Sequence, residues 1–151
     1  YVAEDPEAIA MLPQPFVTAA LAQVEDLHVI IDLNEEWNGH EIGCEQVTGV
    51  IVVRKEFAEQ NPEAVETFLR EYEASMQYTA DDAAGAAALI EKYGIVGKAA
   101  LAEKALPGCH LNYEVGSEMK DSLSGFLQIL YDENPASVGG SVPEDDFYYG
   151  I

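Results

Sequence analysis

The chain has 151 residues, of which 28 are acidic and 7 are basic, and its net charge is −21. Hydrophobic residues make up 48% of it, which is enough for one folded domain and excludes a disordered chain. Nucleic-acid binding and adsorption to an anionic membrane are excluded as well, because both need clustered Lys and Arg, and the first 53 residues contain neither. No apolar run is long enough for direct membrane insertion of this segment.

The first third of the chain predicts two strand-and-helix steps. Residues 7–12 form a short apolar run that predicts a buried strand, and Pro13 and Pro15 predict an extended turn after it. Helical spacing follows over residues 16–23, and the apolar run 27–33 predicts a second strand. Strands that are apolar on both faces fit a parallel sheet covered by helices.

The rest of the chain predicts one further strand and then mostly helices. The β-branched run 47–53 is the clearest strand signal. Asn61, Pro62 and Glu63 have the order of a cap, a first-turn proline and an acidic residue that faces the helix dipole. The later predicted elements are helices over about 82–93, 98–105 and 117–133, and a short strand or extended connector at 111–115. Because three strands make a poor sheet, we expect partner strands outside this sequence, as part of a longer chain.

The cysteines and acidic runs predict no metal site. Cys44 and Cys109 are the two cysteines, and a disulfide, two buried thiols and functional thiols all stay open for them. There is no CxxC motif and no Cys/His spacing of a zinc site. The run Glu144–Asp146 lacks the alternating oxygen ligands of an EF-hand loop. We therefore expect no metal and no cofactor.

Several segments, taken in their order, resemble the C-terminal half of a solute-binding protein of an ABC importer, in the group that binds sulfonates, nitrate and thiamine precursors. They are IAMLPQPFVTAAL, then TGVIVVRKEF followed by NPEAVETFLREYEAS, and GGSVPEDDFYY at the end. The resemblance implies an α/β class, a partial periplasmic-binding-protein-like type II fold with a helix-rich C-terminal half. Residues 1–46 are then the end of the second lobe, and residues 47–151 are the crossing strand and the helical completion of the first lobe.

The same resemblance implies a function in transport. The protein then captures a small-molecule solute between two lobes by hinge closure and delivers it to the membrane permease of the transporter. Its location is then extracytoplasmic, in the periplasm or as a cell-surface lipoprotein, with the signal segment absent from this sequence. The scarcity of basic residues favours a neutral or cationic solute.

An enzyme is not expected from the residues. There is no GxSxG motif and no phosphate-binding loop. A pyrimidine-forming enzyme of the same broad family uses a cysteine-rich segment, whereas Cys44 and Cys109 stand singly. Two alternatives to the transport reading stay open. One is a stand-alone acidic interaction domain without a small-molecule ligand, and the other is a pyrimidine-precursor-forming enzyme of the same fold.

The candidate ligand-binding residues are Gln14, Pro15, Phe16, Thr18, Trp37, Thr48 and Gly49. By the resemblance, Gln14–Phe16 form the turn that approaches the ligand, where an amide can hydrogen-bond and a ring can stack; an ordinary proline turn with a buried Phe16 is the alternative. Thr18 donates a hydroxyl or is a plain helix residue. Trp37 is a cleft wall or a cover of the core. Gly49, next to Thr48, lets a ligand approach the backbone or marks a bend without a ligand.

Overall fold

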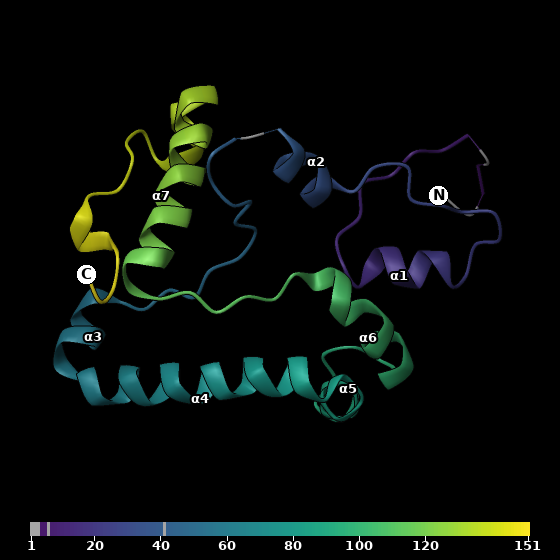
Figure 1. Ribbon diagram of the computed structural model, residues 1–151, viewed down its shortest axis with the longest axis horizontal. Coiled ribbons are helices and arrows are strands. Elements are labelled where there is room, and N and C mark those ends of the chain that lie inside the picture. Colours follow the sequence, from purple (N-terminus) through teal and green to yellow (C-terminus); the bar gives the residue numbers. More distant parts are fainter. Residues whose placement is uncertain (1–3, 6, 41) are drawn as a thin grey trace. The chain divides into compact units, whose positions relative to one another are not determined.

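The computed structural model describes residues 4–5, 7–40 and 42–151, and the regular elements of these residues are all helices (Figure 1). The α-helices are α1 (Phe16–Leu21), α2 (Leu33–Gly39), α3 (Lys55–Gln60), α4 (Pro62–Asp81), α5 (Ala83–Lys92), α6 (Ala99–Ala105) and α7 (Gly116–Glu133). The 3-10 helices are η1 (Leu106–Cys109), η2 (Pro135–Val138) and η3 (Asp145–Phe147). Contacts divide the described chain into two compact units: unit 1 within residues 1–29 and 56–113, and unit 2 within residues 30–55 and 114–151.

Unit 1 has its core at α5 and α6. Helix α5 contacts α4 and α6, and α6 also contacts α1. The buried residues are Ala86 and Ala87 of α5, Ala102 and Ala105 of α6, and Val65 of α4. Because alanine side chains are small, the helix backbones can approach one another closely here. The core of unit 1 is therefore compact and poor in large apolar side chains.

Helix α4 begins where the sequence predicts it. Pro62 occupies the first turn and Glu63 is the acidic residue of that turn. Asn61 does not cap the helix with its side chain, however, because its Nδ2 donates to the carbonyl oxygen of Phe57 at 3.1 Å. Asp82 follows α4 and caps α5, where its carboxylate accepts from the backbone N–H of Gly85 at 2.9 Å. The helices predicted over 16–23, from Pro62 onward, and over 82–93, 98–105 and 117–133 are all confirmed.

The predicted α/β class, with its partial periplasmic-binding-protein-like type II fold, is wrong. The described residues contain no strand: segments 7–12, 47–53 and 111–115 are irregular, and the predicted strand 27–33 runs into α2. A strand is stabilised by backbone hydrogen bonds to a neighbouring strand. The backbone of residues 47–53 makes no such bond with another described residue. A β-branched composition favours an extended backbone, but it does not provide a partner.

The predicted lobe boundary between residues 46 and 47 stays a prediction. The compact units defined by contacts are each made of two separate stretches of chain. Residues 30–55 and 114–151, which are far apart in sequence, form unit 2 together.

In unit 2, the residues after α7 fold back onto that helix. Ser137 of η2 donates its hydroxyl to the carbonyl oxygen of Leu130 in α7 at 3.0 Å. Lys120 of α7 donates to Asp145 at 2.8 Å, and its ammonium lies 6.0 Å from the centre of the Tyr148 ring. Tyr148 is 6% exposed, and its buried hydroxyl has no hydrogen-bond partner among the described residues. These contacts fix the C-terminal tail within unit 2.

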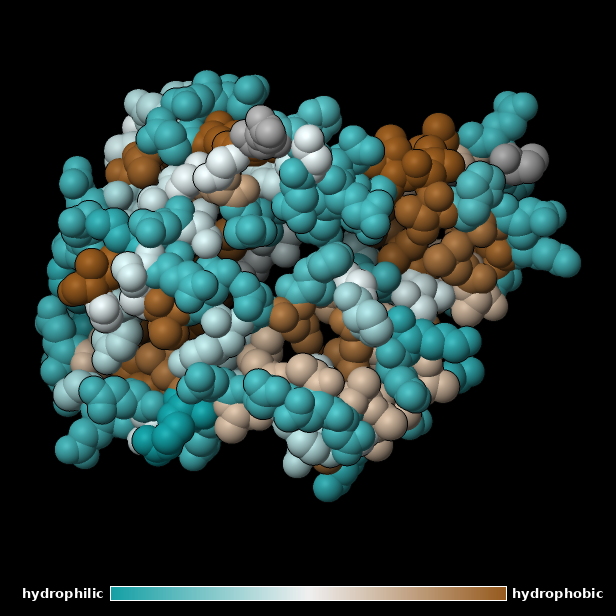
Figure 2. Space-filling view, viewed as in Figure 1, coloured by the Kyte–Doolittle hydropathy of each residue, from teal (hydrophilic) through white to brown (hydrophobic). Residues whose placement is uncertain are grey.

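Many large apolar side chains lie on the surface. Ile9 and Met11 are 79% and 83% exposed, and Figure 2 shows hydrophobic residues gathered over the N-terminal part of unit 1. Monomeric soluble proteins seldom expose large contiguous apolar patches, so exposure of this kind marks interaction surfaces. Within the described chain, no helix combines the length and the apolar character needed to cross a bilayer.

Candidate functional site

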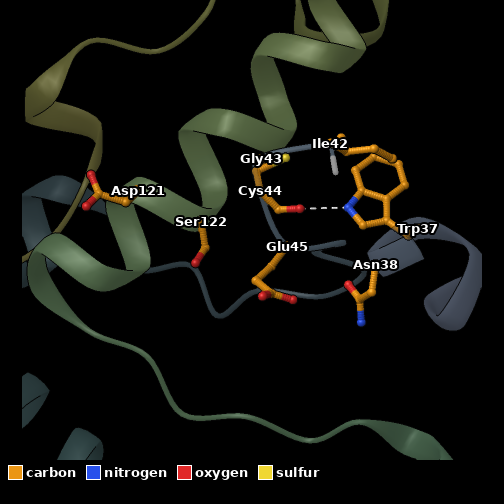
Figure 3. A pocket seen from close by; sticks show the side chains of 8 residues that line it. All are labelled: Trp37, Asn38, Ile42, Gly43, Cys44, Glu45, Asp121 and Ser122. Carbon is orange, nitrogen blue, oxygen red and sulfur yellow. Dashed lines mark hydrogen bonds between the residues drawn. The ribbon is translucent and has the colours of Figure 1, made fainter. Parts of the chain in front are cut away.

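A pocket of about 520 Å³ lies within unit 2 and is lined by three segments (Figure 3). Helix α2 contributes Trp37 and Asn38, the loop after it contributes Ile42, Gly43, Cys44 and Glu45, and α7 contributes Asp121 and Ser122. The volume is within the range of about 300–1,000 Å³ that is usual for small-molecule sites. This pocket is the candidate functional site.

Local sequence explains how α2 positions Trp37. Asp32 caps the helix, since its Oδ1 accepts from the backbone N–H groups of Asn34 at 2.9 Å and Glu35 at 3.3 Å. Trp37 follows within the same short helix and is half-buried. Its Nε1 donates to the carbonyl oxygen of Cys44 at 2.7 Å (Figure 3). Its ring centre lies 5.5 Å from that of Phe126 in α7. One side chain therefore joins the three segments that line the pocket.

A glycine in α7 allows the loop to approach this helix closely. A Cβ added at Gly125 would lie 2.6 Å from the Cβ of Cys44, which is closer than side chains pack in proteins. Gly125 costs helix stability through its backbone freedom. The close contact with Cys44 gives a structural reason for a glycine at this position.

Substituting Gly125 by alanine tests this contact. We expect Gly125→Ala to displace the loop and to expose the Cys44 thiol, because the new methyl group and the Cys44 side chain cannot share the space. The rate of alkylation of Cys44 by iodoacetamide should rise several-fold, as followed by mass spectrometry of the intact protein. Ser124→Ala, one residue earlier in α7, is the matched control and should leave the rate unchanged. Equal rates in Gly125→Ala and the parent protein would show that the loop does not depend on this contact.

Cys44 belongs to unit 2 and Cys109 to unit 1, and both are free thiols in the structure. Burial raises the pKa of Cys44, and the neighbouring Glu45 carboxylate raises it further. Burial also raises the pKa of Cys109. Because the thiolate is the reactive form, neither cysteine is activated as a nucleophile at neutral pH. The chemistry of the pocket therefore rests on its other groups.

The polar groups of the pocket are two carboxylates, a hydroxyl and an amide. Glu45 and Asp121 are exposed at its surface, and Ser122 and Asn38 can both donate and accept hydrogen bonds. None of its eight lining residues is basic. The site therefore disfavours an anion and suits a neutral or cationic ligand that can lie against the Trp37 ring. Among residues 4–5, 7–40 and 42–151, no three metal-ligating side chains are grouped to hold a metal ion.

The predicted ligand-binding residues fall in both units. Trp37 lines the pocket, whereas Thr48 and Gly49 belong to the same unit but are exposed outside it. The others, namely Gln14, Pro15, Phe16 and Thr18, belong to unit 1. Their roles in ligand binding stay predictions. Sequence reasoning missed the α7 residues Asp121 and Ser122, because they are more than seventy residues from Trp37 and no local motif marks them.

In unit 1, Gln14 uses its side chain for internal contacts. Its Oε1 accepts from the hydroxyl of Thr18 at 2.6 Å. Its amide nitrogen lies against Gly108 of η1, where an added Cβ would be 2.7 Å away. Phe16 is 62% exposed, so the alternative of a buried Phe16 does not hold. Gln14 thus holds the start of α1 against the segment that follows α6.

Comparison with known families gives a match. A family model for menaquinone biosynthesis, VitK2_biosynth, matches residues 18–132. The matched range contains all eight residues that line the pocket, and it begins after Gln14, Pro15 and Phe16. No curated protein and no solved structure is significantly similar to the chain.

This match overturns the transport hypothesis. The matching family is one of menaquinone biosynthesis enzymes and not of solute-binding proteins, so the resemblance to an ABC importer component is wrong. The predictions that the protein captures a solute for transport, that its partner is a transporter permease and that it is not an enzyme are wrong for the same reason. Of the readings left open, an enzyme is closer to the match. An apolar run followed by an amphipathic helix is common to many folds, which is why these segments misled. The extracytoplasmic location stays a prediction.

Proposed function

The chain belongs to the menaquinone biosynthesis family, and we propose that it is an enzyme that acts on a small ring-containing intermediate of this quinone. The observation that carries the proposal is the family match over residues 18–132, which is most of the chain. The same range runs from within α1 through most of α7 and includes the whole lining of the pocket.

The chemistry of the pocket supports a ligand of this kind. Menaquinone is built around a flat naphthoquinone ring, and a flat ring can stack on an indole that is held in place. Two contacts fix the indole of Trp37: its Nε1 donates a hydrogen bond to the carbonyl oxygen of Cys44, and its ring packs against the ring of Phe126. We infer that Trp37 provides the wall on which the ring lies.

The polar groups supply hydrogen bonds and proton transfer. In this proposal Ser122 and Asn38 orient the oxygen substituents of the ring. Glu45 or Asp121 exchanges a proton with the substrate, as carboxylates do in general acid–base catalysis. The absence of basic side chains among the lining residues favours a substrate whose bound portion is neutral.

A gene deletion with complementation tests the proposal. In the source organism we expect deletion to abolish menaquinone, measured by liquid chromatography and mass spectrometry of quinone extracts, and the wild-type gene to restore it. Ser122→Leu fills the pocket and should restore at least about tenfold less menaquinone, equivalent to about 1.4 kcal/mol of lost transition-state binding. Gln128→Leu, on the exposed part of the same helix and outside the pocket, is the matched control and should restore fully.

The variants and the deletion strain test two parts of the proposal separately, namely the place where the substrate binds and the function in menaquinone biosynthesis. Full restoration by Ser122→Leu would show that the substrate binds elsewhere, while the function in menaquinone biosynthesis would stand. Undiminished menaquinone in the deletion strain would overturn the function itself.

A further inference from the structure

Residues 45–54, between α2 and α3, run without a helix, a turn or a bend. Within this stretch, the backbone N–H and C=O groups of residues 47–53 make no hydrogen bond with another described residue. The side chains are also exposed: Val50 and Ile51 are both 52% exposed, and Val52 is 77% exposed. A stretch that combines unpaired backbone with exposed β-branched side chains is a template for strand pairing.

The stretch is also the place where two copies of an acidic chain can approach. Each copy carries a net charge of −21, so contact between most parts of two copies is repulsive. Residues 46–53 carry no charge, and the basic pair Arg54 and Lys55 follows them. A contact through these residues therefore avoids most of the repulsion and brings basic groups to the interface.

We propose that residues 47–53 of two copies pair as antiparallel β-strands, centred on Val50, and that the protein is a dimer through this contact. Val50 of one copy then lies opposite Val50 of the other. A residue that precedes Val50 in one strand faces the residue that follows Val50 by the same number of positions in the other strand. Ile51 then faces Gly49 of the second copy, which sets a large side chain against the smallest one. Val47 faces Val53 in the same way.

Charge complementarity selects the antiparallel direction. This register sets the basic end of one strand, Arg54 and Lys55, against the acidic end of the other, at Glu45. A parallel pair would set Arg54 against Arg54, and like charges opposite each other destabilise a sheet. In this register Lys55, which also binds Asp146 of its own chain at 2.7 Å, faces Glu45 of the second copy, and Arg54 faces Gln46.

Cysteine cross-linking tests the register. In a Cys44→Ser, Cys109→Ser background, Val50→Cys places two thiols directly opposite each other, with Cβ atoms about 4.5–5.5 Å apart. Val52→Cys is the matched control, because Val52 faces Thr48 and its own equivalent lies about 13 Å further along the ladder. We expect Val50→Cys to form a disulfide-linked dimer at least about tenfold faster than Val52→Cys. Random collision would favour Val52→Cys instead, since Val52 is the more exposed of the two.

Sedimentation velocity on the chain with its native cysteines gives an independent test at about 0.15 M salt, where charges are screened beyond about 8 Å. We expect the parent protein to be a dimer, and Val50→Lys to weaken dimerisation at least about tenfold by placing two charges opposite each other. Ala80→Lys adds the same charge at an exposed position of α4 and should leave the dimer intact. A monomeric parent protein would overturn the proposal, as would equal cross-linking of Val50→Cys and Val52→Cys or a dimer that survives Val50→Lys.

Discussion

Raising the NaCl concentration from about 0.05 M to about 1 M is expected to raise the Tm of this protein by about 10 °C or more. The chain holds 28 acidic and 7 basic residues, so its folded state confines a large excess of negative charge in a small volume. Salt shortens the screening length from more than 10 Å to about 3 Å over this range and so weakens the repulsion between neighbouring carboxylates.

The attractive pairs in the structure do not offset this repulsion. Lys55 binds Asp146 and Lys120 binds Asp145, and both pairs lie at the surface. The hydrogen bond and the charge of Lys55 lower the pKa of Asp146, and the hydrogen bond to Asp145 raises the pKa of Lys120, but solvent screens such exposed pairs. Repulsion among the remaining carboxylates therefore dominates the electrostatics.

Thermal melts followed by circular dichroism measure the effect of salt. Sucrose at matched osmolality is the control for exclusion of solute from the surface, which also stabilises proteins but leaves charge repulsion unchanged. The double variant Glu71→Gln, Glu103→Gln removes two exposed charges and should show a smaller rise in Tm with salt. A Tm that does not change with NaCl would contradict the expectation.

Enlarging Ala87 is expected to lower the free energy of unfolding by about 1–3 kcal/mol. Ala87 lies in α5 and is 0% exposed, and α5 contacts both α4 and α6. In Ala87→Leu the added atoms have no space unless the helices separate, and separation would expose the other buried alanines, Ala86, Ala102 and Ala105. Urea unfolding measures the change.

The adjacent residue provides the control for this substitution. Ala88 lies in the same helix but is exposed, and leucine is nearly as good a helix former as alanine. Ala88→Leu should therefore change the free energy of unfolding by less than about 0.5 kcal/mol. Equal free energies of unfolding for Ala87→Leu and Ala88→Leu would show that the core of unit 1 does not lie around the buried alanines of α5 and α6.

The sequence predicts helices well here because their signals are local. The proline at position 62, the glycine at position 94 and the apolar spacing in α4 and α7 all act within a few residues of the helix they define. Strands depend on partners that are distant in sequence, and the run 47–53 has none in the described chain despite its composition. Composition alone therefore overstated the number of strands.

The candidate site was predictable only in part. Trp37 is an aromatic residue beside a glycine-containing loop, which is a local signal, and it does line the pocket. Ser122 and Asp121 come to the same pocket because α7 packs against the loop at Gly125 and Cys44, and no spacing in the sequence shows that contact. The function was misread because the segments that suggested transport have patterns that many folds share.

The menaquinone content of cells that lack this gene tests the central claim most directly. Quinones extracted from the deletion strain should contain almost no menaquinone, and the reintroduced gene should return the content to that of the parent strain. A deletion strain with the same menaquinone content as its parent, or a parent organism that contains none, would contradict the assignment to menaquinone biosynthesis.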